Sequence, residues 1–127
     1  METALKTAAE IFGIKHANDE NYGGLILNKD AMPSHHVILL PETRVLDWDA
    51  AHEWAKKEGA NVFNRQEGHL LQANLGHLFE KRWYWLEEQY SAYLAWTQHF
   101  DDGCQDGAGK DGKNRVRLVR RLPFIHS

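Results

Sequence analysis

This sequence has a single cysteine, no long apolar run and no strong charge of one sign, and each of these features excludes a class of protein. The single cysteine, Cys104, cannot form an intramolecular disulfide or contribute to a Cys-rich metal framework. No apolar run approaches the roughly 18 residues of a transmembrane helix, and no basic stretch followed by an apolar segment opens the chain. We therefore expect a protein of the cytoplasm that does not associate with membranes.

The charges nearly balance, whereas aromatic residues are abundant. The chain has 15 Lys and Arg against 18 Asp and Glu, and its formal net charge is −3. This imbalance is too small to predict general binding to nucleic acid or anionic membrane. The 127 residues include five Trp, five Phe and four Tyr, and each such side chain buries on the order of 150–250 Å². The composition predicts a folded protein of one compact domain.

The first twenty residues predict a short helix and a connector. Four apolar residues share one helical face: Leu5, Ala8, Ala9 and Phe12. Thr3 is the expected N-cap, and Gly13 follows the end of the helix. We expect residues 1–20 to form an accessory N-terminal helix and connector, through which the chain can form a homo-oligomer. Residues 21–127 are expected to form the main domain.

The main domain is predicted to begin with a β-hairpin. Residues 22–28 and 35–40 are β-prone, and turn-forming residues separate them. Pro41 is expected to end the second strand because proline cannot donate a hydrogen bond to a neighbouring strand.

Two helices are predicted after the hairpin. Asp47 is the expected N-cap of a helix over residues 48–58, which ends before a glycine. Asn64 is the expected N-cap of the second helix, and Glu67, three residues on, completes a capping box.

The C-terminal third predicts short strands separated by turns. In residues 92–100 apolar and polar side chains alternate. The inner face of this strand is expected to carry Leu94, Trp96 and Phe100. Residues 107–112 are expected to form a flexible loop. Residues 115–122 are expected to form a half-buried last strand with a basic face.

The outer face of the strand over residues 92–100, with its flanking residues, is the main candidate binding surface. It combines aromatic and polar residues of the kind enriched at recognition surfaces, with Tyr90, Tyr93, Thr97, His99, Asp101 and Asp102 as its expected members. An ordinary solvated strand is the alternative interpretation.

The basic C-terminal strand is a second candidate. Lys110, Lys113, Arg115 and Arg117 could contact phosphates or an acidic partner. The interpretation that we favour is internal pairing of these arginines and Arg120 with the nearby acidic residues Asp101, Asp102 and Asp106, because arginine and carboxylate form bidentate pairs.

Catalytic and metal-binding motifs are missing. His35 and His36 are adjacent, so in a strand they point to opposite faces and cannot bind one metal ion together. A hydrolase built from Glu88, His99 and Asp102 is the remaining enzymatic alternative, but no spacing supports it. We expect no metal, no cofactor and no enzymatic activity.

The C-terminal half carries a series of spaced motifs that point to a known family. They are Trp83-Tyr84-Trp85, Glu88-Gln89, Tyr93-Leu94-Ala95-Trp96, Phe100-Asp101-Asp102-Gly103-Cys104-Gln105, Lys110 and Arg115-Val116-Arg117-Leu118-Val119-Arg120-Arg121-Leu122. Upstream, Tyr22-Gly23-Gly24-Leu25-Ile26-Leu27, His35-His36-Val37-Ile38-Leu39-Leu40-Pro41 and Asn64-Arg65-Gln66-Glu67 extend the pattern. Over roughly residues 21–122 the chain resembles the Lcl C-terminal domain family, whose function is largely unknown and which is common in phages and prophages.

This resemblance implies an α+β fold of the C-type-lectin-like kind, with two main helices flanking small antiparallel sheets. The calcium-binding motifs of C-type lectins are missing here, so calcium-dependent sugar binding is not expected. The resemblance favours a non-enzymatic phage or prophage protein that binds a host or phage protein, for instance as a cytoplasmic inhibitor of a host-defence complex. A receptor-binding adhesin of the virion is one alternative. A nucleic-acid-binding or nucleotide-binding accessory protein is another.

Overall fold

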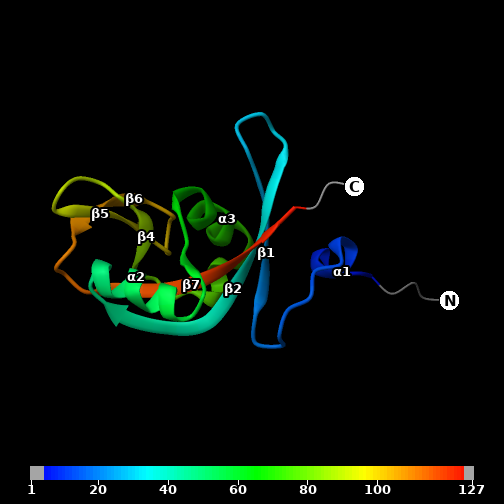
Figure 1. Cartoon of the computed structure of the whole chain (residues 1–127), viewed down its shortest axis with the longest axis horizontal. Coiled ribbons are helices and arrows are strands. Elements are labelled where there is room, and N and C mark those ends of the chain that lie inside the picture. The colour runs from blue at the N-terminus through cyan, green and yellow to red at the C-terminus, as the bar shows by residue number, and fades with distance from the viewer. Residues whose placement is uncertain (1–4, 125–127) are drawn as a thin grey trace.

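The computed structural model describes residues 5–124 as an α+β fold with three α-helices and one seven-stranded sheet (Figure 1). The elements in chain order are α1 (Ala8–Phe12), β1 (Asn21–Leu27), β2 (Pro33–Leu46), α2 (Trp48–Lys57), β3 (Asn61–Val62), α3 (Arg65–Leu75), a 3₁₀ turn (Gly76–Leu78), β4 (Trp83–Gln89), β5 (Leu94–His99), β6 (Gln105–Gly109) and β7 (Asn114–Pro123). No helix of this part of the chain is long and apolar enough to cross a membrane.

The sheet is mixed and open, with the strand order β1-β2-β7-β4-β5-β6 and the short β3 paired with β7. The neighbouring strands are antiparallel except for β4 and β7, which run parallel. The expected arrangement of two helices flanking small antiparallel sheets is therefore wrong, because the strands join into one sheet through β7. The α+β class is confirmed.

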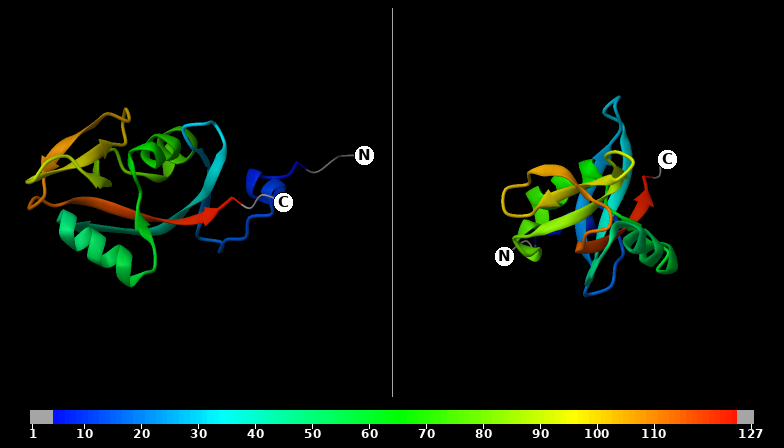
Figure 2. Two further views of the ribbon diagram at one scale, coloured as in Figure 1. Left: turned by 45° about the horizontal axis from the view of Figure 1, so that its top comes forward. Right: turned by 90° about the vertical axis from the view of Figure 1, so that its left-hand side faces the viewer.

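Both faces of the sheet are covered, and side chains of β7 alternate between them. Val116 and Leu118 lie in a core with α2, whereas Val119 lies in a second core with Leu71 of α3. The two helices accordingly lie on either side of β7 (Figure 2). Trp85 is fully buried in the core beneath α2. Because neither face of the central strands meets water, alternation along these strands does not separate buried from exposed residues.

Both main helices begin where the sequence predicts. The Asp47 side chain accepts a hydrogen bond from the backbone N–H of Ala50, at 2.8 Å, and caps α2. Asn64 and Glu67 form the expected capping box of α3. The N-terminal helix is shorter than predicted, because Thr7 rather than Thr3 is its N-cap. Thr3 itself lies outside the described residues.

Two strand boundaries differ from the prediction. The hairpin of β1 and β2 is confirmed, but β2 continues past Pro41 to Leu46. The pairing of β2 with β7 has a register shift between Leu39 and Thr43, and this irregularity accommodates a residue without an N–H. The loop expected at residues 107–112 is wrong in its first part, since residues 105–109 form β6 against β5.

Candidate binding surface

The turn between β4 and β5 presents two exposed tyrosines. The exposed fraction is 49% for Tyr90 and 85% for Tyr93. Within the turn, the backbone N–H of Tyr90 donates to the carbonyl of Leu94 at 2.9 Å. From outside it, the Lys110 ammonium donates to Gln89 Oε1 at 2.7 Å and to the Ala92 carbonyl at 2.9 Å. The turn that exposes the two tyrosines is thus fixed both by its own backbone hydrogen bond and by Lys110.

Next to this turn, three side chains from different elements form a stack. The guanidinium carbon of Arg65, at the start of α3, lies 3.6 Å from the ring centroid of Trp96 in β5. The ring of Tyr90 contacts the same indole, with 4.6 Å between centroids. Gly107 in β6 makes room for Tyr90, because a Cβ there would lie 3.1 Å from the tyrosine ring. We name Arg65, Tyr90, Tyr93 and Trp96 the aromatic surface.

Buried amides support the stack from below. The Gln105 amide nitrogen donates to the carbonyl of Arg65 and to Gln98 Oε1, both at 2.8 Å. The Gln98 side chain is fully buried and donates to the carbonyl of Gly68 in α3 at 2.9 Å. This chain of hydrogen bonds joins β6, β5 and α3 and fixes the backbone from which Arg65 projects.

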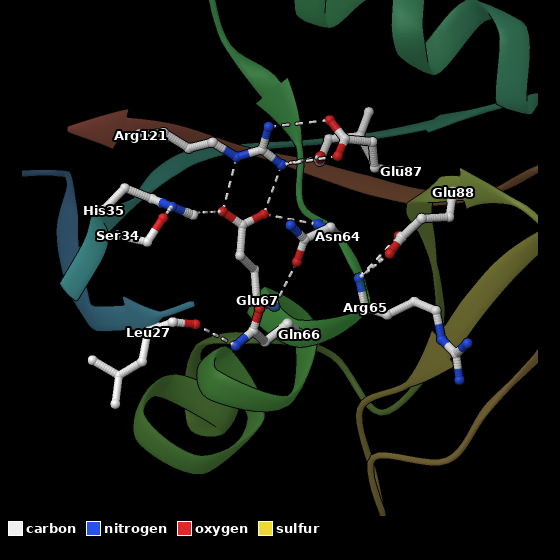
Figure 3. A network of polar contacts seen from close by, with 11 residues as sticks. Leu27, Ser34, His35, Asn64, Arg65, Gln66, Glu67, Glu87, Glu88 and Arg121 are labelled. Atoms are coloured by element: carbon white, nitrogen blue, oxygen red, sulfur yellow. Dashed lines mark hydrogen bonds and ion pairs between the residues drawn. The ribbon is translucent and has the colours of Figure 1, made fainter. Parts of the chain in front are cut away.

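Glu88 in β4 also fixes the backbone of Arg65. Its two carboxylate oxygens accept the backbone N–H of Arg65 at 2.9 and 3.1 Å (Figure 3). Burial raises the pKa of the Glu88 carboxyl above its ordinary value, and the charge of Glu87 acts in the same direction. These two effects outweigh the backbone hydrogen bonds from Arg65 and Glu88 and the charge of Arg65, all of which lower the pKa.

The structure separates the other predicted members of the binding face. Thr97 is buried, and its hydroxyl donates to the carbonyl of Asp106 at 2.8 Å, so the expectation that it faces solvent is wrong. His99 is half-buried, packs edge-on against Trp83 and accepts the backbone N–H of Asp101. Asp101 and Asp102 are exposed, but they lie at the far end of β5, about 20 Å from its start at ~3.3 Å per residue.

The four predicted basic residues do not form one exposed stripe. Arg117 is buried and donates to the carbonyls of Leu40 and Leu78. Arg115 forms an ion pair with Glu80. Lys110 donates to the turn that carries Tyr90 and Tyr93. Of the four, only Lys113 is exposed and makes no hydrogen bond or ion pair within residues 5–124. These contacts leave little of the basic strand for phosphate groups.

The predicted pairing of these arginines with Asp101, Asp102 and Asp106 is also wrong. Arg120 pairs with Glu20 at 2.8 Å, and Arg115 with Glu80. The physical reason is the strand order: β7 lies between β2 and β4, whereas Asp101 and Asp102 lie in the turn between β5 and β6, and Asp106 lies in the edge strand β6.

A buried ionic network lies behind the aromatic surface, and sequence reasoning missed it (Figure 3). The fully buried Glu67 carboxylate accepts two hydrogen bonds from Arg121, each 2.8 Å long, and lies 2.7 Å from His35 Nε2. Arg121 also pairs with Glu87 at 3.1 Å. Burial alone would raise the pKa of Glu67, but the hydrogen bonds from Arg121 and Asn64 and the charge of Arg121 keep it below its ordinary value.

The described residues bring together neither a metal centre nor the three residues of the hydrolase alternative. No group of three or more His, Cys, Asp or Glu in this region is placed to hold a metal ion. Glu88 is bonded to Arg65, His99 to the backbone of Asp101, and Asp102 to the backbone of Cys104. The three residues of the hydrolase alternative are therefore each engaged locally rather than with one another.

Comparison of the sequence with models of known protein families finds no match, and comparison with curated proteins finds none either. The family resemblance described above stays a prediction, and the function has to be inferred from the surface itself.

Replacing Lys110 with methionine is expected to loosen the tyrosine turn. The change keeps an apolar side chain over Trp48 but removes the hydrogen bonds to Gln89 and Ala92. We expect a loss of about 1 kcal/mol in the free energy of unfolding and faster amide hydrogen exchange in residues 90–94. The same change at the exposed Lys113 is the matched control. Equal exchange in both variants would show that Lys110 does not hold the turn.

Proposed function

We propose that this chain is a non-enzymatic binding protein of phage or prophage origin, which uses a C-type-lectin-like domain to bind a protein partner through the aromatic surface. The observation that carries the proposal is the display of two exposed tyrosines from one fixed turn: Tyr93 is 85% exposed, and the ring of Tyr90 packs on Trp96, on which Arg65 also lies. A cytoplasmic component of host defence is the partner that we favour. An adhesin of the virion is the alternative setting for the same surface.

The composition of the surface supports this proposal. Tyrosine, tryptophan and arginine are the residues most enriched among those that dominate binding energy at protein interfaces. Holding them in place before binding reduces the entropy that association costs. Lys110, Gln105 and Glu88 supply that restraint here.

The nucleic-acid alternative has weaker support. It requires Arg115 and Arg117 to reach phosphates, but Arg117 donates to two backbone carbonyls and Arg115 is paired with Glu80. For an enzyme, the support is weaker still. Ser34, His35 and Glu67 follow one another in a chain of hydrogen bonds, but the two bonds from Arg121 already compensate the Glu67 charge that would stabilise a protonated His35.

Replacing Tyr90 and Tyr93 together with alanine tests the proposal. A partner captured by the wild-type chain from host lysate, then purified, is expected to bind the double variant at least about tenfold more weakly, because two anchoring rings are lost. Calorimetry with the purified partner gives the two dissociation constants. Val45→Ala, which trims an exposed apolar residue of β2, is the control. An unchanged affinity of the double variant would contradict the proposed surface.

A further inference from the structure

The Arg65 guanidinium is held in place, but most of its donors are unused. Its Nε donates to Gln105 Oε1 at 2.8 Å, and its plane lies on Trp96. Within residues 5–124 no hydrogen bond or ion pair involves its two Nη atoms, and the residue is exposed. Because an arginine side chain carries five N–H donors, the four on its two Nη atoms remain for a ligand.

Within residues 5–124, the Glu88 carboxylate contacts Arg65 without forming an ion pair with its guanidinium. Glu88 contacts Arg65, but both of its oxygens accept the backbone N–H and not the guanidinium. In Figure 3 the Arg65 side chain points away from Glu88 and from the network around Glu67. The local fold thus uses Glu88 to fix the backbone position of Arg65 and leaves the Nη donors of its guanidinium unused.

The arginines of β7 provide the contrast. Arg115 and Arg120 each form an ion pair with a glutamate, and Arg121 pairs with two. Arg117 is bonded to backbone carbonyls. Of these five arginines, only Arg65 is exposed, lies on an aromatic ring and has two Nη atoms without a hydrogen-bond partner among the described residues. Such an arrangement costs little entropy on binding, since the side chain is already ordered.

We infer that Arg65 is the specificity-determining contact of the aromatic surface, and that it binds the carboxylate of an aspartate or glutamate on a partner protein, beside an apolar side chain that packs on the exposed part of Tyr90. This inference rests on the proposed function and adds the chemistry of the partner. The planar fork matches a carboxylate in a bidentate pair.

A protein carboxylate fits this site better than a nucleic-acid backbone. The site offers one available cation, whereas tight binding of a polyanion needs several. Glu87 and Glu88 on the adjacent strand and the net charge of −3 oppose any anion, but they oppose a chain of phosphates more than a single carboxylate, because the repulsion grows with the charge of the ligand.

A library of random 12-residue peptides, selected on the purified full chain, tests the inference directly. We expect the selected peptides to share an acidic residue next to an aromatic or aliphatic one. For a synthetic consensus peptide, Arg65→Gln is expected to weaken binding about tenfold or more, as is the change of the peptide's acidic residue to its amide. With both changes combined, the loss should be little larger than with either alone, because they remove the same contact.

Controls separate this inference from the proposed function. Arg82→Gln, at an exposed arginine outside the aromatic surface, should leave binding unchanged, and thermal melting checks that Arg65→Gln is folded. Peptides that lose affinity with Tyr90→Ala/Tyr93→Ala but not with Arg65→Gln would overturn the inference and keep the proposed function. Failure of selection, or binding unaffected by both variants, would overturn both. Displacement of the peptide by single-stranded DNA but not by an acidic peptide would also overturn the carboxylate assignment.

Discussion

Glu67→Ala is expected to lower the free energy of unfolding by about 3–5 kcal/mol, the range for removing one partner of a buried ion pair. The Glu67 side chain is fully buried, and its two oxygens receive Arg121, His35 and the backbone N–H of Asn64. Without the Glu67 carboxylate, Glu87 is the only charged partner that remains for Arg121 among the described residues. Helix α3 also loses half of its capping box. Urea unfolding followed by circular dichroism measures the change.

Two further variants separate the charge from the cap. Glu67→Gln can still cap the helix, because glutamine also serves at this position, but its amide cannot compensate the Arg121 charge. We expect Glu67→Gln to lower the free energy of unfolding, but by less than Glu67→Ala does. Glu67→Met combined with Arg121→Met removes both charges and keeps the volume, so it should be about 2 kcal/mol more stable than Glu67→Ala. If every single variant lies within about 1 kcal/mol of the wild type, the network contributes little to stability.

The network also predicts how stability depends on pH. The pKa of Glu67 is lowered in the folded state relative to its ordinary value of 4.5, so the unfolded chain binds a proton first as the pH falls. The stabilisation is present above about pH 4.5 and is lost as the pH falls through the folded-state pKa. Glu88, whose pKa is raised, acts in the opposite direction. The difference between wild type and Glu67→Gln isolates the Glu67 contribution, and a difference that does not shrink at acid pH would contradict it.

Gly68→Ala is expected to destabilise the protein by about 2–4 kcal/mol, although alanine normally favours a helix by ~1 kcal/mol. A Cβ at Gly68 would lie 2.4 Å from Gln98 Oε1, and Gln98 is fully buried. Relief of this overlap must move the amide that bonds to Gly68 and Gln105, so overpacking and loss of a buried hydrogen bond add together.

Gly76→Ala is the matched control, because it makes the same change just after α3. Gly76 has helical dihedral angles, and a Cβ there would make only an ordinary contact, 3.4 Å from the Gln72 side chain. We expect this variant to be neutral or stabilised by up to about 1 kcal/mol. Thermal melting of both variants gives the comparison, and equal melting temperatures would mean that Gln98 gives way without cost.

The parts of the fold that depend on local interactions could be predicted from the sequence. The caps at Asp47 and Asn64 place both main helices, since a cap and its N–H donors are three residues apart. The continuity of the sheet could not be predicted, because it depends on pairings such as Ile38 with Arg120, which are distant in sequence. The glycines of β6 indicate a loop by local propensity, whereas packing of Tyr90 on Gly107 favours a strand.

The candidate site divides in the same way. Tyr90 and Tyr93 could be found because an aromatic residue on or beside the outer face of the predicted strand over residues 92–100 is expected to meet solvent. The structure exposes both for a different reason: they lie in the turn between β4 and β5, where side chains are rarely covered. The prediction for Thr97 is wrong because the face of β5 that Thr97 shares with Ala95 is buried, whereas Leu94 and Trp96, expected on the inner face, are only half-buried. Alternation shows which residues share a face but not which face meets the core. Nothing in the sequence marked Arg65 as a binding residue, because Trp96 and Gln105, which position it, lie on β5 and β6, far from α3 in the sequence.

The position of β7 has a consequence for the order of folding. This strand comes last of the seven along the chain, yet it lies in the middle of the sheet and pairs with β2, β3 and β4. During synthesis the earlier strands therefore leave the ribosome before the strand that joins them exists. Glu67 also has no Arg121 to pair with until β7 has been synthesised, because Arg121 lies on that strand. We expect the two halves of the sheet to assemble only after β7 has emerged, so that a chain interrupted before residue 114 would stay open to proteases and chaperones.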